Sequence, residues 1–282
     1  MSNLLSQVTH TLQTTTGVRV VIGAVEGCGK TTLACGAPKP LLIPLEQGFA
    51  GISCNKTPLI KTYDELMSLM KEITAAAQKG TFAYKTIIPD SATALERMIH
   101  SKIVQADPGW KAGNQKGVTM ESTLGGYGKA YDRANELCAE FLSMCDDLAT
   151  YAGINIVIPC HVFASKVLDP ASGEYNQWDL LLHSPKNNRT AGKREMLAQW
   201  CDALGFLFEP MFVSKTSESF SQGISANKGR VLGLERTPGY VAKNRFGIQG
   251  EVAIPKVDGW NHFAQAIYNG SGRDVFNREP AV

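Results

Sequence analysis

The sequence predicts an α/β protein with a mainly parallel, twisted sheet covered by helices on both faces. Two observations support this prediction. Short β-branched and apolar runs alternate with segments whose apolar residues recur at helical spacing. Polar residues also follow several of these runs at the points where the strands would end. Repeated strand-helix-strand units favour a parallel sheet whose ligands bind at the carboxyl ends of the strands.

The first unit joins a strand to a helix through a loop that contains glycines. Residues 18–23, Val-Arg-Val-Val-Ile-Gly, predict a strand, and a helix can begin in the stretch 31–35. Between them lies Ala24-Val25-Glu26-Gly27-Cys28-Gly29-Lys30-Thr31-Thr32. This segment fits the phosphate-loop pattern G-x-x-x-x-G-K-[ST] except at its first position, where alanine replaces glycine.

The chemistry of a phosphate loop follows from its residue types. Glycines let successive backbone N–H groups converge on an anion, a lysine reaches the β and γ phosphates, and a hydroxyl holds Mg²⁺. We therefore expect ATP and Mg²⁺ as cofactors, with Lys30 also catalytic and Thr31 a metal ligand. The residues expected to bind the nucleotide are Val25, Glu26, Gly27, Cys28, Gly29, Lys30, Thr31 and Thr32.

Three further apolar runs end in polar residues, and two helical patterns lie between the runs. The predicted strands are 40–45 before Glu46, 84–89 before Asp90 and Ser91, and 154–160 before His161. The predicted amphipathic helices are 63–70 and 130–148. In a parallel sheet the polar residues would meet at one edge.

Each of these polar residues has a functional and a structural interpretation. Asp90 is a candidate Walker-B carboxylate that holds Mg²⁺ through its water shell, or a strand-end cap or turn. Glu46 is a candidate base or orienting group for the attacking water, or an exposed strand-end glutamate. His161 is a candidate contact for the γ-phosphate, whereas a lone histidine is more often structural. Spacing alone leaves these alternatives open.

The later part of the chain predicts shorter strands and two long loops. We expect strands at 203–208, 229–234, 240–242 and 251–254, the later ones antiparallel at one side of the sheet. The stretches 106–129 and 163–199 lack a periodic pattern, so we expect them to be long functional loops within one domain.

Three prolines conflict with this assignment of strands. Pro44, Pro89 and Pro159 each follow an isoleucine near the end of a predicted strand. Because proline cannot donate a ladder hydrogen bond, each nitrogen must face no acceptor. The sequence gives no reason why this happens in three strands.

Composition excludes several classes of protein. The chain has 282 residues, 44% of them hydrophobic, which is enough to fill one large α/β core. Its seven cysteines form no C-x-x-C pair, which argues against a disulfide framework or a zinc site. Without a signal peptide or a long apolar run, we expect a soluble cytoplasmic protein with no membrane partner. A net charge of +2 does not by itself indicate a nucleic-acid partner.

The order of the motifs resembles the RecA core over residues 18 to about 255. The motifs are Gly-Lys-Thr-Thr at 29–32, Leu-Glu-Gln-Gly at 45–48, Ile-Ile-Pro-Asp-Ser at 87–91 and Pro-Cys-His at 159–161. Within that superfamily the chain looks most like small phage recombinases of the Sak type, which are associated with single-strand annealing. These share the Gly-Gly-Tyr-Gly-Lys stretch at 125–129.

The resemblance implies roles for particular residues. Glu46 matches the catalytic glutamate of RecA-like proteins, Asp90 their Walker-B aspartate, and His161 the polar sensor that begins the second DNA-binding loop. The segment Lys243-Asn244-Arg245-Phe246-Gly247 is similar to the KNRFG motif of bacterial RadA proteins. Lys243 and Arg245 would then be catalytic residues that reach the nucleotide of a neighbouring subunit. The alternative is an ordinary basic turn before a strand.

RecA-like proteins also have two DNA-binding loops, and the two patternless stretches occupy the corresponding positions. Basic side chains there would neutralise phosphates, while Trp110 and Trp178 would stack on unpaired bases. A charged loop that is merely solvated is the alternative. The residues expected to bind DNA are Lys111, Lys116, Lys166, Lys186, Arg189, Lys193 and Arg194.

The resemblance implies an ATP-dependent recombinase or annealing protein that binds single-stranded DNA and hydrolyses ATP at a site between subunits. Its partners would be single-stranded DNA, further copies in a filament or ring, and a single-strand DNA-binding protein, in a bacterial host cytoplasm if a phage encodes it. A P-loop small-molecule phosphotransferase and a DNA-binding scaffold with little hydrolysis are the alternatives. The expected boundaries are an arm at 1–17, an ATPase core at 18–255 and a tail at 256–282.

Overall fold

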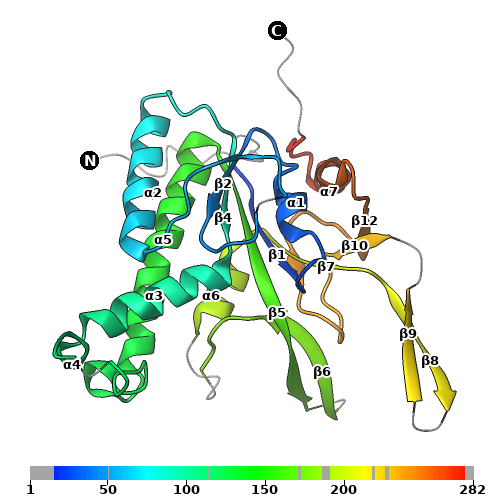
Figure 1. Cartoon of the computed structure of the whole chain (residues 1–282). Helices are drawn as coiled ribbons and strands as arrows, with labels where there is room; N and C mark the ends of the chain where they lie inside the picture. The colour runs from blue at the N-terminus through cyan, green and yellow to red at the C-terminus, as the bar shows by residue number, and fades with distance from the viewer. Residues whose placement is uncertain are drawn as a thin grey trace, which may run out of the picture.

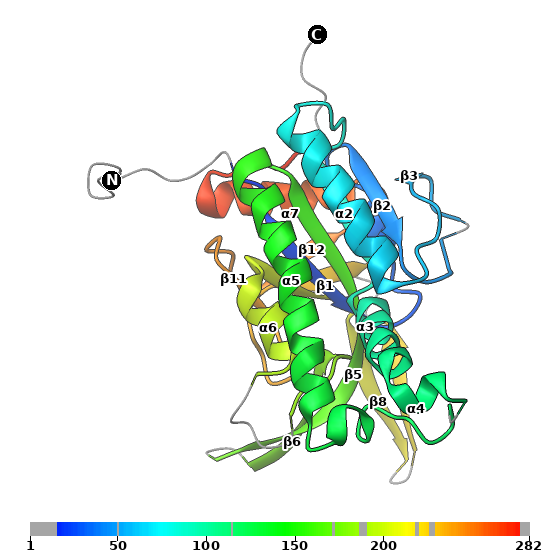
Figure 2. The same ribbon diagram turned by 90° about the vertical axis from the view of Figure 1, so that its left-hand side faces the viewer.

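A ten-stranded sheet runs through the computed structural model and separates two sets of helices (Figure 1 and Figure 2). The structure describes residues 16–49, 51–113, 115–170, 173–185, 191–217, 220–225 and 229–276, and side chains within 212–228 are not described. The strand order is β12-β10-β7-β1-β5-β4-β2-β3, with β11 paired to β7 and β6 paired to β5.

Most of the sheet is parallel, and its later strands are antiparallel at one side. The parallel strands are β1 (Arg19–Ala24), β2 (Pro40–Pro44), β3 (Asn55–Lys56), β4 (Thr86–Asp90), β5 (Asn155–Asp169) and β7 (Ala203–Phe208). The antiparallel strands are β6 (Gly173–Leu180), β10 (Arg230–Gly233), β11 (Lys243–Asn244) and β12 (Glu251–Ile254). The predicted α/β fold with a mainly parallel sheet is confirmed.

Helices cover both faces of the sheet. One face carries α2 (Tyr63–Gln78), α3 (Ala92–Ala106), α5 (Lys129–Ala152) and α6 (Lys193–Trp200), and the other carries α1 (Lys30–Ala34) and α7 (Gly259–Ser271). Successive side chains of a strand point to opposite faces, so Val21 packs against the first set while Val20 and Ile22 pack against the second. Each face therefore has its own apolar core.

Local sequence fixes where the helices begin and end. Thr62 caps α2 through a capping box with Glu65, and the Ser91 hydroxyl accepts a hydrogen bond from the Ala94 N–H at the start of α3. The long helix α5 ends at Gly153, whose φ of 64° is the left-handed conformation that glycine adopts readily. These caps set the polar strand ends against the helices that follow.

The three strand prolines lie where pairing between neighbouring strands has stopped. Pairing of β4 with β5 covers only Thr86 and Ile87 of β4. Backbone N–H groups along a strand alternate in direction, and this alternation turns the nitrogens of Pro89 and Pro159 toward the gap between β4 and β5. Pro44 likewise faces the side of β2 beyond its short pairing with β3. The prolines thus accompany an opening of the sheet at the carboxyl ends of its strands.

The two stretches predicted to be loops contain regular structure, which corrects the sequence-based expectation. Strand β5 continues beyond His161 and forms a hairpin with β6, followed by α6. The first stretch contains the short helix α4 (Pro108–Lys111) and a 3₁₀ turn, η2 (Thr123–Gly125). The expected strand at 240–242 is a single bridge between Tyr240 and Trp178.

Three segments project from the same end of the molecule. These are the segment from α4 to η2, which we call the α4 segment, the β5–β6 hairpin, and a separate hairpin of β8 (Met211–Ser217) and β9 (Phe220–Ser225). All three extend toward the bottom of Figure 1 and of Figure 2. Among the described residues, no helix is long and apolar enough to cross a membrane.

The expected boundary at residue 255 falls between β12 and a helix that packs into the same apolar core. Helix α7 lies beyond that boundary, yet Trp260, Phe263 and Ile267 are fully or almost fully buried against the strands and α1. Residues 1–15 of the expected arm lie outside the described residues.

Candidate active site

The phosphate loop connects the end of β1 to the start of α1. Gly27 and Gly29 have φ values of 75° and 87°, a left-handed conformation that side chains other than glycine rarely adopt. A Cβ atom at Gly29 would lie 2.2 Å from a guanidinium nitrogen of Arg230, which donates a hydrogen bond to the Cys28 carbonyl at 3.0 Å. The loop thus has the backbone geometry of an anion site at a helix start.

Alanine at the first loop position fits the backbone without strain. Ala24 is the last residue of β1, is fully buried, and pairs with His161 of β5. Its φ is not positive. The departure from the usual glycine therefore leaves the path of the loop intact.

Two oxygen groups meet beside the loop in a way that suits Mg²⁺. The Thr31 hydroxyl donates a hydrogen bond of 2.6 Å to the Asp90 carboxylate. Burial raises the pKa of Asp90 above its ordinary value, and the nearby Glu46 carboxylate raises it further, whereas the Thr31 hydrogen bond lowers it. A divalent cation would relieve this unfavourable burial, and Mg²⁺ prefers oxygen ligands of these kinds.

Glu46 lies two residues beyond β2 and is held by three side chains. Its carboxylate accepts a hydrogen bond of 2.7 Å from Ser91, lies 3.0 Å from the His161 Nε2 atom, and forms an ion pair of 2.5 Å with Arg97. Burial would raise the pKa of Glu46, but the hydrogen bonds from Ser91 and His161 and the charge of Arg97 lower it below its ordinary value. Glu46 is therefore an ionised, fixed carboxylate beside the Asp90 site.

His161 bridges two carboxylates. Its Nδ1 atom lies 3.0 Å from Glu26 of the phosphate loop, and its Nε2 atom lies 3.0 Å from Glu46. Each ring nitrogen of His161 therefore faces a carboxylate oxygen. His161 thus links Glu26 of the phosphate loop to Glu46 beyond the end of β2.

The structure brings together the residues that the sequence singled out around the phosphate loop. Lys30, Thr31, Glu46 and Asp90 lie at the carboxyl ends of β1, β2 and β4, and His161 lies where the pairing of β5 with β1 ends. Sequence reasoning missed two arginines that contact them. Arg97 lies one turn into α3 and Arg230 opens β10. Nothing in the local sequence marks either residue, because each meets the site across a long separation along the chain.

A hollow beside the phosphate loop also could not be predicted from the sequence. It has a volume of about 200 Å³ and lies next to Thr32 and Leu33 of α1. Its other wall comes from Pro255, Lys256 and Trp260, in the segment expected to be a tail. Arg230 joins the two walls, since it donates hydrogen bonds to both the Cys28 and the Pro255 carbonyl groups.

Lys243 and Arg245 lie at the opposite end of the strands from the phosphate loop. Lys243 pairs with Leu204 near the start of β7, and its ammonium group donates to three carbonyl groups at the end of α6, at 2.8–3.0 Å. Arg245 forms an ion pair of 3.2 Å with Asp202. Cations at a helix carboxyl end stabilise that helix. Within one chain these side chains support α6, and their expected role in a neighbouring site stays a prediction.

The residues expected to bind DNA occupy different environments. Lys111, Lys116 and Lys166 are exposed. Arg194 forms ion pairs with Asp179 and Glu195. Lys186 and Arg189 lie outside the described residues.

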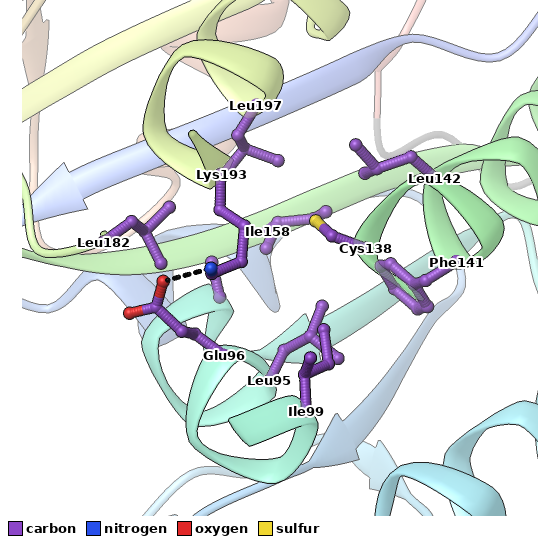
Figure 3. Close-up of a pocket in the computed structure, with 11 residues that line it drawn as sticks. Leu95, Glu96, Ile99, Cys138, Phe141, Leu142, Ile158, Leu182, Lys193 and Leu197 are labelled. Carbon is purple, nitrogen blue, oxygen red and sulfur yellow. Dashed lines mark ion pairs between the residues drawn. The ribbon is translucent and has the colours of Figure 1, made fainter. Parts of the chain in front are cut away.

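Lys193 is buried, which corrects the expectation that it contacts DNA. Its side chain is 2% exposed and its ammonium group lies 3.3 Å from the Glu96 carboxylate (Figure 3). Apolar side chains of α3, α5 and α6 surround the pair, among them Leu95, Phe141 and Leu197. Glu96 also accepts a hydrogen bond of 2.8 Å from the His183 N–H. Lys193 therefore ties the end of the second stretch to the helix that follows Asp90.

We expect Lys193→Met to lower the free energy of unfolding by about 3 kcal/mol, because the Glu96 carboxylate would lose the cation that offsets its burial. Chemical denaturation of the variant would measure the loss. Lys166→Met is the matched control, since its ion pair with Glu174 is exposed and the expected change is below about 1 kcal/mol. Adding Glu96→Gln to Lys193→Met should recover part of the loss. Equal effects of the two lysine variants would contradict the buried ion pair.

Comparison with protein families gives one match. A family model described as an AAA domain matches residues 16–246, which is most of the chain and includes the phosphate loop, Glu46, Asp90 and His161. A comparison with curated proteins finds no match.

Proposed function

The chain belongs to the AAA domain family of P-loop ATPases, and on this premise we propose that it hydrolyses ATP while bound to single-stranded DNA, as a recombinase or annealing protein of the RecA-like type. One observation carries the proposal. The phosphate loop and the strand-end side chains lie toward the same end of the sheet as the β5–β6 hairpin, whose long strand continues directly from His161. A single DNA strand bound on that hairpin would be connected to the ATP site through β5, which is one continuous β-strand.

Each site residue has a distinct task in the proposed hydrolysis. The phosphate-loop backbone and Lys30 would bind the phosphates. Thr31 and Asp90 would hold Mg²⁺, which supplies positive charge to the phosphate oxygens. Glu46 would orient the attacking water and accept its proton, because it is ionised and fixed by Ser91. The His161 ring would donate a hydrogen bond to the γ-phosphate in exchange for Glu26.

The hollow beside Thr32 has a place in the same proposal. It adjoins Thr32 and Leu33, which directly follow the loop, and is also lined by Pro255, Lys256 and Trp260. A nucleotide whose phosphates rest on the loop would extend its ribose and base into this hollow. Arg230 would then sense the nucleotide through its hydrogen bonds to both walls.

The remaining parts of the proposal concern partners. Lys111 and Lys116 on the α4 segment and Lys166 on the β5–β6 hairpin are exposed cations on two projections at one end of the molecule. They are suited to neutralise the phosphates of a single strand. Lys243 and Arg245 lie far from the phosphate loop of their own chain, so a catalytic role for them requires a second copy. We include a shared site between copies in the proposal.

The test is ATP turnover with and without single-stranded DNA. We expect DNA to raise turnover at least about tenfold in the unmodified protein, and Lys30→Ala to abolish turnover with or without DNA, because the phosphates lose their cation. Phosphate release measured over a range of chain concentrations gives the second readout. A site shared between copies predicts that turnover per chain falls on dilution.

Two outcomes would reject parts of the proposal. DNA that binds without changing ATP turnover would indicate a scaffold with little hydrolysis. Phosphorylation of a small molecule, with no effect of DNA on turnover or assembly, would indicate a phosphotransferase and reject the recombinase function.

A further inference from the structure

A large open cavity lies against the other flank of the phosphate loop. Its volume is about 1030 Å³. Residues 25–28 form one wall, and Trp178 of β6, Phe206 and Phe208 of β7, and Tyr240 form the opposite wall. The hydrolysis proposed above uses none of these aromatic residues.

The aromatic wall presents flat rings to the cavity. Phe206 stacks with Tyr240 at 5.1 Å between ring centroids, with Phe208 at 5.3 Å, and with Trp178 at 6.2 Å. The corresponding interplanar angles are 20°, 29° and 22°, so Phe206 is roughly parallel to each of its three neighbours, whereas Phe208 and Tyr240 are tilted by 48° to each other. The Trp178 side chain is 38% exposed, whereas Phe206 and Tyr240 are buried behind it. An exposed indole on a rigid aromatic base favours a planar ligand that stacks.

The polar residues of the cavity select the chemistry of that ligand. Glu26, Glu209 and Glu251 line it, and their carboxylates accept hydrogen bonds but repel phosphate groups. The Tyr240 hydroxyl donates to Glu251 at 3.2 Å, which fixes one carboxylate at the edge of the aromatic group. Such a site suits an uncharged ring that carries an amino group.

The β5–β6 hairpin carries Lys166 on the same face as residues that line the cavity. Ala164 faces Trp178 across the β5–β6 ladder, and Lys166 faces Asn176 two residues further on. Directly opposed residues and those two positions away share a face of the hairpin, and both Ala164 and Asn176 line the cavity. Lys166 lies on this face of the hairpin, where it forms an exposed ion pair of 3.0 Å with Glu174 that a phosphate could replace.

The cavity is connected to the phosphate loop. The Cys28 thiol donates a hydrogen bond of 3.3 Å to the carbonyl of Leu207, between the two phenylalanines of β7. Glu26 and Gly27 contribute to both the cavity and the ATP site. A ligand in the cavity would contact the loop that binds the phosphates.

We propose that this cavity binds an unpaired nucleobase bearing an exocyclic amino group, stacked on Trp178 with the amino group toward the carboxylates. The source of the base is a single DNA strand, which rests on the proposed function, or a free nucleoside of the same chemistry. Thymine has no amino group and so binds more weakly than cytosine.

The experiment uses the full chain and two kinds of probe. Fluorescence anisotropy measures affinity for labelled oligo-dC and oligo-dT, and saturation-transfer NMR detects free cytidine. We expect Trp178→Ala to weaken oligo-dC binding about 5- to 100-fold through loss of stacking, and oligo-dT to bind the unmodified protein at least about threefold more weakly than oligo-dC. Trp178→Phe should restore most of the affinity. Tyr151→Ala removes an aromatic ring that is 84% exposed on α5, outside the cavity, and should leave affinity unchanged.

The outcomes separate the cavity from the proposed function. If oligo-dC binds but Trp178→Ala has no effect and the two oligonucleotides bind equally, the cavity assignment is overturned while DNA binding stands. If no oligonucleotide binds but cytidine gives a signal that Trp178→Ala removes, the cavity assignment holds and the DNA-binding function fails. If neither probe binds, both are overturned.

Discussion

The Glu46→Gln variant is expected to bind ATP as the unmodified protein does and to hydrolyse it about 10²- to 10⁴-fold more slowly. Glutamine keeps the shape of the side chain and still accepts the hydrogen bond from Ser91, so the site should stay assembled. It does not accept a proton from water at neutral pH. Steady-state phosphate release measures the loss, and equilibrium binding of labelled ATP shows whether the nucleotide site is intact.

A matched substitution elsewhere makes this result specific. Glu140→Gln on α5 makes the same chemical change at an exposed position, and its turnover should stay within a factor of about two of the unmodified protein, as surface substitutions usually do. Thermal unfolding of both variants would show that the fold is retained. Turnover by Glu46→Gln within about threefold of the unmodified protein would exclude Glu46 as the base.

The contacts of Glu46 suggest how nucleotide binding would change the site. Arg97 brings positive charge to this carboxylate, His161 also contacts it, and Glu26 contacts the same histidine from the phosphate loop. An arriving γ-phosphate is an anion, so it would repel Glu26 and attract His161. Glu26 is 79% exposed and can leave without opening the core. The site therefore has one exposed carboxylate that is readily displaced and one half-buried carboxylate that is held.

Much of the site could be predicted because its elements are local in sequence. The phosphate loop follows a β-branched run, and Glu46 and Asp90 follow apolar strands. The spacing of apolar residues and the position of these residues after predicted strands are therefore enough to place them. The parallel sheet then brings the strand ends to one edge, which is why separate motifs meet. His161 was located correctly, although β5 does not end there.

The remaining parts of the fold and of the site depend on contacts between segments that are distant in the sequence. No periodic pattern of apolar residues indicates such contacts. The β5–β6 hairpin was missed because it projects from the molecule and much of its surface is exposed, so its apolar residues do not alternate regularly. The burial of Lys193 could not be predicted, because its partner Glu96 lies on another helix, far away in the sequence. Arg97 and Arg230 have no distinguishing sequence context, and only the folded chain brings them beside Glu46 and Cys28.

A chain that ends after Pro255 is expected not to fold. Helix α7 buries Trp260, Phe263 and Ile267 against the face of the sheet that carries the side chains of Val20 and Ile22 of β1. Removal of the helix would expose that core. A Cβ atom at Gly36 would lie 2.9 Å from the Cβ of Trp260, so the segment after α1 approaches α7 closely. The Trp260 indole N–H also donates a hydrogen bond of 2.8 Å to the Val275 carbonyl. Circular dichroism of the truncated chain should show no cooperative thermal transition.

Point variants in α7 extend this test to a chain of full length. Trp260→Ala should lower the free energy of unfolding by about 3–5 kcal/mol, the usual cost of deleting a buried tryptophan. Tyr268→Ala removes an aromatic ring that is 48% exposed on the same helix, and its effect should stay below about 1 kcal/mol. A truncated chain that unfolds cooperatively at the temperature of the full chain would contradict this assignment. Because the hollow beside Thr32 is lined by Lys256 and Trp260, loss of α7 should also remove a wall of the proposed nucleotide site. The last helix would thus couple the stability of the fold to nucleotide binding.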